Sequence, residues 1–184
     1  MRDFGADISA LALNTATLGN NIDGHGMGWP VERVIDACAR RGFGGMVFWR
    51  REIGTRGVEI GNRVRATGMQ VVGLCRGPFL VGPLAPVTVM DDFRAAIDMA
   101  ADLQAAVLTI VVGGIETGTK GPGESLRRVT DIVAAALPYA ISAGVKLALE
   151  PLHPVYAGNR SCLTTLRDAL DMCDQVDAPG LGWR

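Results

Sequence analysis

The stretch "LALEPLHP" (147–154) is the most informative part of the sequence for the fold. It begins as a continuous apolar run, ends in the carboxylate of Glu150, and places the imidazole of His153 three positions later, between two prolines. An apolar run without polar alternation is typical of a parallel strand that is covered on both faces. A carboxylate at the end of such a strand costs free energy unless something compensates its charge. What compensates Glu150 is therefore the main question.

The same kind of apolar run recurs along the chain and alternates with amphipathic helical patterns. Strand starts are spaced by about 25–40 residues, which is the size of a βα unit. The predicted strands are 8–14, 44–50, 69–77, 107–114 and 145–151, with the start of a sixth at 180–184, and the predicted helices are 31–42, 57–68, 90–104, 124–144 and 162–176. Asp91 or Asp92 is the expected N-cap of the third helix, and Pro138 is expected to kink or split the fourth.

Two folds use this rhythm, the doubly wound sheet and the (β/α)8 barrel. The segment "LNTATLGNN" (13–21) lacks the GxGxxG pattern expected after the first strand of a dinucleotide-binding sheet. Barrel enzymes build their active sites from the C-terminal ends of the strands. Those ends carry polar, aromatic or glycine residues on five consecutive predicted strands: Asn14, Trp49 with Arg50, Arg76, Gly113 with Gly114, and Glu150. The sequence therefore predicts an α/β protein with a (β/α)8 TIM-barrel fold.

Length limits how much of a barrel is present. A complete (β/α)8 barrel needs about 250 residues, whereas this chain has 184. We expect a single partial barrel domain over 1–184, with about five βα units and the start of strand six. We also expect the polypeptide to continue beyond Arg184, and the chain 1–184 alone to be inactive.

Composition narrows the classes of partner. The 18 basic and 19 acidic residues give a formal net charge of -1 with no basic stripe, which disfavours nucleic acid. The longest apolar runs, such as "AAVLTIVV" (105–112), are too short to cross a bilayer, and the N-terminus has no apolar signal core. The four cysteines are scattered, as expected for reduced and mostly buried thiols. We expect a cytoplasmic protein without nucleic-acid or membrane partners, and a homo-oligomer remains open.

Three interpretations of Glu150 remain open on these grounds. It is a structural carboxylate that caps a turn or pairs with an arginine, a general base that works without metal, or a ligand of a divalent cation. His153 is expected at the rim of the same mouth, within reach of a substrate hydroxyl. Arg50, Arg76 and Arg160 are candidates for holding an anionic group. For Arg50 a surface ion pair explains the sequence equally well, because Arg51 and Glu52 adjoin it.

Four motifs together resemble those of a known family. They are "LNTAT" (13–17), "FWRREI" (48–53), "LCRGPFL" (74–80) and "EPLHPVYAGNRS" (150–161). The sequence is similar in these motifs to the xylose isomerase-like TIM barrels, a family of sugar phosphate isomerases and epimerases. The resemblance covers nearly all of the chain, and the combination of "EPLHP" with "LCRG" is its most specific part.

The resemblance implies a divalent metal, Mn, Mg, Zn or Co, at the barrel mouth. Its ligands in the family come from the ends of strands five to eight, and only the first of them, Glu150, lies within this sequence. The implied activity is isomerisation or epimerisation of a small sugar, keto-sugar or cyclitol through an enediolate. Asn14, Trp49, Arg50, Arg76 and Arg160 would contact the substrate, and His153 would take part in catalysis.

Two other activities remain open beside this one. A metal-dependent dehydratase or lyase that acts on an oxidised sugar conjugate would use the same enolate chemistry. A barrel subunit that binds a ligand or partner without turnover would not need it. The ketose 3-epimerases of the superfamily carry a second glutamate several residues after the first. The segment 151–161 contains no acidic residue, so we do not expect an enzyme of that two-glutamate type.

Overall fold

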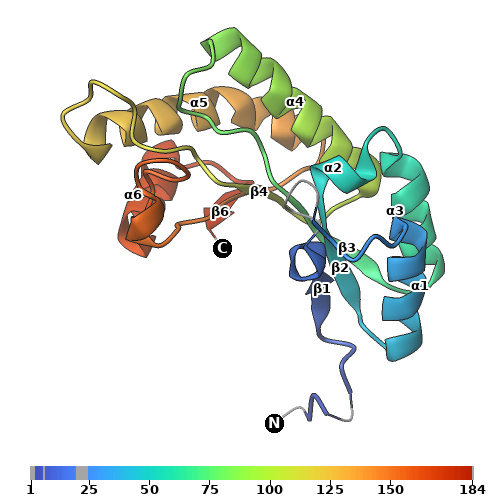
Figure 1. Cartoon of the computed structure of the whole chain (residues 1–184). Coiled ribbons are helices and arrows are strands. Elements are labelled where there is room, and N and C mark those ends of the chain that lie inside the picture. Colours follow the sequence, from blue (N-terminus) through green and yellow to red (C-terminus); the bar gives the residue numbers. More distant parts are fainter. Residues whose placement is uncertain (1–2, 6, 20–24, 184) are drawn as a thin grey trace. The chain divides into compact units, whose positions relative to one another are not determined.

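The computed structural model describes residues 3–5, 7–19 and 25–183. The chain forms two compact units (Figure 1). Unit 1 comprises Met1–Cys75 and Met99–Val107, and unit 2 comprises Arg76–Asp98 and Leu108–Arg184. In each unit, short parallel strands alternate along the chain with helices.

Unit 1 is built on three parallel strands, β1 (Ala12–Asn14), β2 (Gly45–Trp49) and β3 (Gln70–Cys75). β2 pairs with both of the others, and its register with β3 shifts between Met46 and Val47. The helices of this unit are η1 (Thr15–Leu18), α1 (Val31–Arg41), α2 (Arg50–Ile53) and α3 (Gly57–Ala66). Figure 1 shows α1 and α3 side by side along these strands. Fully buried side chains of β2, α1 and α3, namely Phe48, Ile35 and Ile60, form its core.

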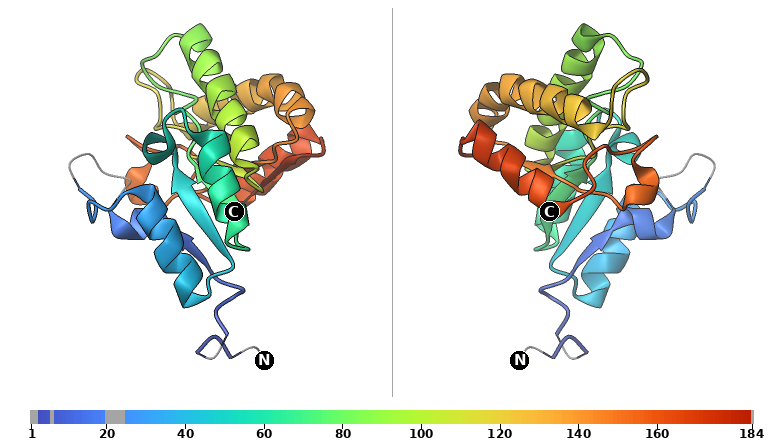
Figure 2. Two further views of the ribbon diagram at one scale, coloured as in Figure 1. Left: turned by 90° about the vertical axis from the view of Figure 1, so that its right-hand side faces the viewer. Right: turned by 90° about the vertical axis from the view of Figure 1, so that its left-hand side faces the viewer.

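Unit 2 is built on β4 (Leu108–Ile110), β5 (Leu147–Leu149) and β6 (Leu181–Trp183), and β5 pairs in parallel with both neighbours. Its helices are α4 (Pro86–Leu103), whose last turn belongs to unit 1, α5 (Pro122–Ser142), η2 (Pro154–Tyr156) and α6 (Leu166–Val176). α5 and α6 lie against each other (Figure 2). Phe93, Leu108, Ile110 and Leu137 are at most 2% exposed and form the core of this unit.

The predicted order of elements is confirmed, and several boundaries are corrected. The first strand covers only 12–14 of the predicted 8–14. The third predicted helix begins at Pro86, whose fixed φ suits the first turn, so that Asp91 and Asp92 lie inside α4 and do not cap it.

The prediction that Pro138 could split its helix is wrong, because α5 continues through this residue. The last predicted helix begins at Leu166, where the Thr165 side chain accepts a hydrogen bond from Asp168 N. The short helices η1, α2 and η2 were not predicted, because none contains enough residues for a periodic pattern.

Two further expectations can be compared with the described part of the chain. None of its helices is both long enough and apolar enough to cross a membrane. All four cysteines are free thiols, and Cys38, Cys75 and Cys162 are buried.

Candidate functional site

Asn14 and Trp49, which were predicted as site residues, are in direct contact in unit 1. They end β1 and β2, and the indole Nε1 of Trp49 donates a hydrogen bond of 3.2 Å to Asn14 Oδ1. The same oxygen accepts a bond of 3.0 Å from Ala16 N and so caps η1. The structure therefore brings these two residues together through a contact that fixes the plane of the indole.

Glu52 and Thr15 complete this cluster, and sequence reasoning missed both. Glu52 Oε1 accepts a hydrogen bond of 2.7 Å from Trp49 N and another from the hydroxyl of Thr15, which is 0% exposed. A glutamate three residues after Trp49 is the pattern of a side chain that turns back to cap a helix start, and this signal could have identified it. Arg50, which follows Trp49 in the chain, is half-buried at the first position of α2.

Glu150 directly follows β5 in unit 2. Its backbone N–H donates to Ile110 O at 3.0 Å, which fixes the position of the residue beside β4. The side chain is half-buried. Within residues 3–5, 7–19 and 25–183 it makes no hydrogen bond and no ion pair. Of the three interpretations of Glu150, a structural carboxylate fits this environment least well, because the carboxylate has no hydrogen-bond or ion-pair partner among those residues.

His153 is exposed and opens the 3-10 helix η2. Its Nδ1 accepts a hydrogen bond of 3.2 Å from Val155 N. In a neutral imidazole with Nδ1 as acceptor, the proton lies on Nε2. The side chain therefore presents a hydrogen-bond donor to its surroundings in the neutral form.

Arg76 and Arg160 each lie over an aromatic ring of unit 2. The guanidinium carbon of Arg76 lies 3.8 Å from the centroid of the Phe79 ring, and its Nη1 donates to Gly77 O at 3.2 Å. Arg160 lies 5.4 Å from the ring centroid of Tyr156. A cation over an aromatic face is held in a defined orientation by the attraction between its charge and the ring.

Gly113 and Gly114 join the segments that follow β3, β4 and β5. Gly113 N donates to Arg160 O at 3.0 Å, and Gly113 O accepts from Cys162 N at 2.6 Å. Gly113 has φ +102°, and a Cβ there would lie 2.2 Å from Val81 O. A Cβ on Gly114 would lie 2.7 Å from the carbonyl of Gly158. These glycines are therefore required by close backbone packing.

Cys162, in the same region, is not suited to act as a nucleophile. It is 2% exposed, and burial raises the pKa of its thiol to about 11. At neutral pH this group stays protonated, and the thiolate is the reactive form.

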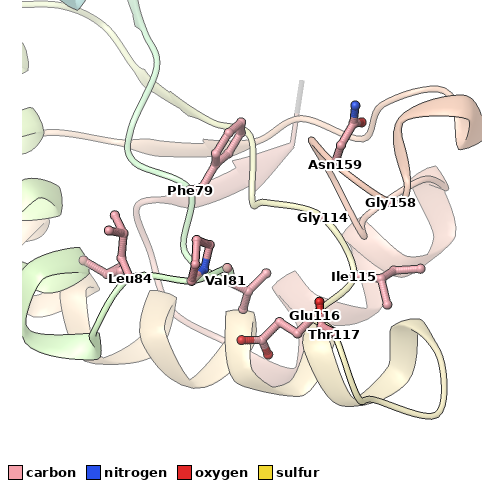
Figure 3. A pocket seen from close by; sticks show the side chains of 12 residues that line it. Phe79, Val81, Leu84, Gly114, Ile115, Glu116, Thr117, Gly158 and Asn159 are labelled. Carbon is pink, nitrogen blue, oxygen red and sulfur yellow. The ribbon is translucent and has the colours of Figure 1, made fainter.

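A cavity of about 630 Å³ opens between the same three segments (Figure 3). One side is formed by Phe79, Val81 and Leu84, and the opposite side by Ile115, Glu116 and Thr117. Gly158 and Asn159 close it from the segment after β5. Sequence reasoning did not predict this cavity, because its walls come from loops that only the fold brings together.

The predicted site residues thus form separate groups in the two units. Asn14 and Trp49 contact each other in unit 1, and Arg76, Gly113 and Glu150 belong to unit 2. Convergence of both groups on one barrel mouth stays a prediction. No group of three or more His, Cys, Asp or Glu side chains suited to a metal occurs within the described residues. Glu150 fits the role of one oxygen ligand, because its half-buried carboxylate makes no hydrogen bond or ion pair with the described residues.

The order of strands and helices by itself defines the fold class of the protein. Parallel strands of which the first five each lead into a helix, with charged and polar groups at their C-terminal ends, are typical of α/β proteins of the TIM-barrel type. The chain belongs to the xylose isomerase-like TIM barrel family, whose model matches residues 35–183. The family resemblance and the fold class predicted from the sequence are therefore confirmed.

Solved structures give the same result. The protein SMc04130 from Sinorhizobium meliloti shares 38% identity with the chain at a TM-score of 0.84, and the match covers 96% of this chain and 62% of that protein. The 3-keto-D-glucoside 4-epimerase YcjR from E. coli is similar at 14% identity and TM-score 0.71, with 84% and 62% covered. The IOLI protein, crystallised with a zinc atom, is similar at 14% identity and TM-score 0.72, with 94% and 60% covered.

Other similar structures are named as D-psicose 3-epimerases and as a family 2 AP endonuclease. These distant similarities show the fold alone. No curated protein matches the sequence. The chain spans 62% of the length of the Sinorhizobium protein.

Proposed function

We propose that the protein is a metal-dependent isomerase or epimerase that acts on a small sugar, keto-sugar or cyclitol through an enediolate. The family and the sugar epimerases among the similar structures support an enzyme of this general kind. The observation that carries the proposal is Glu150, a half-buried carboxylate at the end of β5 that makes no side-chain hydrogen bond or ion pair in the described part of the chain.

Glu150 would be the first ligand of a divalent cation. The remaining ligands would come from the ends of later barrel strands, since the chain spans 62% of its Sinorhizobium relative. A cation of this kind, when bound, polarises a carbonyl or vicinal hydroxyl and stabilises the negative charge of an enediolate. Its identity among Mn, Mg, Zn and Co stays open.

His153 and Arg160 would act on the substrate oxygens. With its Nδ1 accepting from Val155 N, His153 offers an Nε2–H that can donate to a substrate hydroxyl or carbonyl oxygen. In this tautomer it serves as a hydrogen-bond donor, and the transfer of the C–H proton would use His153 or a residue of a later barrel strand. Arg160 cannot accept a proton at neutral pH, and we assign it to holding an anionic oxygen.

Four other residues would bind the substrate. Asn14 and Trp49, joined by their hydrogen bond, would present a polar group and an aromatic wall to a sugar. Arg76 and Arg50 would supply positive charge. The absence of an acidic residue from 151–161 supports an enzyme that is not a ketose 3-epimerase of the two-glutamate type.

The test uses the longest natural form of the protein. Metal content is measured by elemental analysis, and deuterium exchange from solvent into keto-sugars is followed with product analysis. Glu150→Gln should lose stoichiometric metal and most of the exchange while it keeps the fold, as judged by circular dichroism. Full metal content and turnover in this variant would make Glu150 structural.

The same assay separates the residue roles and the alternative activities. His153→Ala should mainly lower kcat, and Arg160→Ala should mainly raise KM. Exchange followed by elimination would identify a dehydratase or lyase. No exchange with any sugar, with the fold intact, would favour a non-catalytic binding subunit.

A further inference from the structure

The cavity of unit 2 has the size of a small-molecule site. Its volume of about 630 Å³ lies within the range of about 300–1,000 Å³ that is usual for ligand pockets. Figure 3 shows its side chains arranged around a common opening, with Phe79 and Leu84 on one side and Ile115 and Glu116 across from them. The proposed isomerase chemistry does not account for this space.

The walls of the cavity are held by backbone contacts. Leu80 N and Val81 N donate to Val112 O at 2.9 and 3.1 Å, and Ile115 N donates to Ala157 O at 2.8 Å. These bonds tie the segments after β3 and β5 to the segment after β4. Because the frame consists of main-chain hydrogen bonds, the cavity is formed in advance of any ligand and does not depend on side-chain rearrangement.

The lining is mainly apolar, and the charge it contains is paired. Its side chains are mainly Phe, Val, Pro, Leu and Ile, and none is Lys, Arg or His. Among the described residues that line it, Glu116 alone is ionisable, and its side chain is 11% exposed and accepts two hydrogen bonds of 2.8 Å from Arg128 Nη1. Leu84 is 60% exposed at the edge. A phosphate would meet no cation in this lining, and a bare sugar would place most of its hydroxyls against apolar side chains, whereas an apolar ring would match them.

One contact and one sequence neighbour connect the cavity with the proposed substrate-binding residues. Phe79 lines the cavity, and its ring also carries the guanidinium of Arg76 at 3.8 Å. Asn159 lines the cavity and immediately precedes Arg160 in the chain. A molecule whose polar part is held by Arg76 and Arg160 could therefore extend an apolar part along Phe79.

We propose that this cavity binds an uncharged apolar substituent, an aryl or short alkyl group, that is attached to the sugar. The substrate class is accordingly a glycoside or another sugar conjugate, and a free sugar lacks the group that fills the cavity. The assignment of the sugar part rests on the proposed function, whereas the assignment of the apolar part rests on the cavity itself.

The experiment compares phenyl β-D-glucopyranoside with methyl β-D-glucopyranoside by isothermal titration calorimetry on the full chain. We expect the phenyl compound to bind about tenfold more tightly, because its ring leaves water for an apolar wall. Leu84→Asp places a charge at the cavity edge and should reduce the ratio to about twofold or less. The matched control is Leu166→Asp, which changes a leucine that is 47% exposed on α6 and lies outside the cavity, and it should leave the ratio unchanged.

Phe79→Leu is a second variant that keeps the wall apolar but removes the aromatic face. Its ratio of phenyl to methyl affinity should lie between the ratio of the wild type and that of Leu84→Asp. A wild-type ratio near one, undetectable binding of the phenyl compound, or a ratio that persists in Leu84→Asp would each overturn the proposal. Failure of the proposed function gives a different result: the phenyl preference remains while no keto-sugar exchanges deuterium.

Discussion

The two units differ in whether the polar residues at their strand ends hydrogen-bond to one another. In unit 1, Asn14, Trp49 and Glu52 bond to one another and to the buried Thr15. In unit 2, Glu150 makes no side-chain hydrogen bond or ion pair with the residues that the structure describes, and His153 is exposed. The same sequence signal therefore marks a cluster that orients its own members in unit 1, and residues that do not bond to one another in unit 2.

This difference has a thermodynamic consequence. A buried polar group that has its partners contributes to stability, and removing one partner leaves the other unsatisfied. A half-buried carboxylate without a partner contributes nothing of that kind and can be destabilising. Substitutions in the two units should therefore differ in whether they affect folding or ligand binding.

The largest expected effect concerns the glycine packing of unit 2. Gly113→Ala should lower the free energy of unfolding by about 3–5 kcal/mol, because the new Cβ meets Val81 O at 2.2 Å in addition to the strain of φ +102°. Gly118→Ala is the matched control, since its φ is +88° and nothing lies within 4 Å of its Cβ, and it should cost about 1 kcal/mol. Urea unfolding measures both, and equal costs would contradict the packing argument.

The next largest effect is expected for Glu52, and Glu150 is the residue to compare with it. Glu52→Gln should cost about 2 kcal/mol in unfolding free energy, because hydrogen bonds from the Thr15 hydroxyl and Trp49 N–H to a carboxylate become bonds to a neutral amide. Glu150→Gln should change stability by less than about 0.5 kcal/mol, since its carboxylate has no such bonds within the described residues. Thermal and urea unfolding of the two variants test the difference. A larger cost for Glu150→Gln would remove the contrast between the units.

A smaller effect is expected at the cavity wall. Glu116→Gln should cost about 1 kcal/mol, because the Glu116 side chain is only 11% exposed and both of its oxygens accept hydrogen bonds from Arg128, which is itself 51% exposed. Asp91→Asn is the matched control, since Asp91 lies 3.7 Å from Arg94 with both side chains more than half exposed, and its cost should be near zero. If both substitutions cost the same in urea unfolding, the pair of Glu116 with Arg128 contributes no more to stability than an exposed ion pair does.

The smallest effect depends on pH and lies in unit 1. The backbone hydrogen bond at Glu32 and the side-chain bond from Arg56 lower the pKa of the Glu32 carboxyl below its ordinary value of 4.5. A lowered folded-state pKa gives stability that is present above about pH 4.5 and is lost as the pH falls through the folded pKa.

Glu32→Gln should therefore cost about 0.5 kcal/mol at pH 7 and nothing at pH values below the folded pKa. Urea unfolding of both variants at pH 7 and at a pH below the folded-state pKa measures this difference in free energy. Glu59→Gln is the control, because Glu59 is 63% exposed and 3.6 Å from the same arginine. A pH-independent cost for Glu32→Gln would show that the charge is not responsible.

Local sequence patterns were sufficient to predict the elements but not the contacts of the site. The apolar runs and helix periods gave the order from β1 to β6, and the polar strand ends were found from position alone. Thr15 and Glu52 were missed because their partners are brought close only by folding: their bond joins residues 37 apart in the chain. The cavity was missed for the same reason, since it lies between three loops.

By itself, the sequence determined that this protein is a parallel α/β chain with Glu150 at the end of a buried strand. Continuous apolar runs have few other stable arrangements, and the strand direction places every such end on the same side of its sheet. Only the tertiary structure decided which strand-end groups have partners. The Asn14–Trp49 bond and the packing of Gly113 against Val81 depend on strand register and loop approach, which are set by the long-range fit of side chains and main chain rather than by local preference.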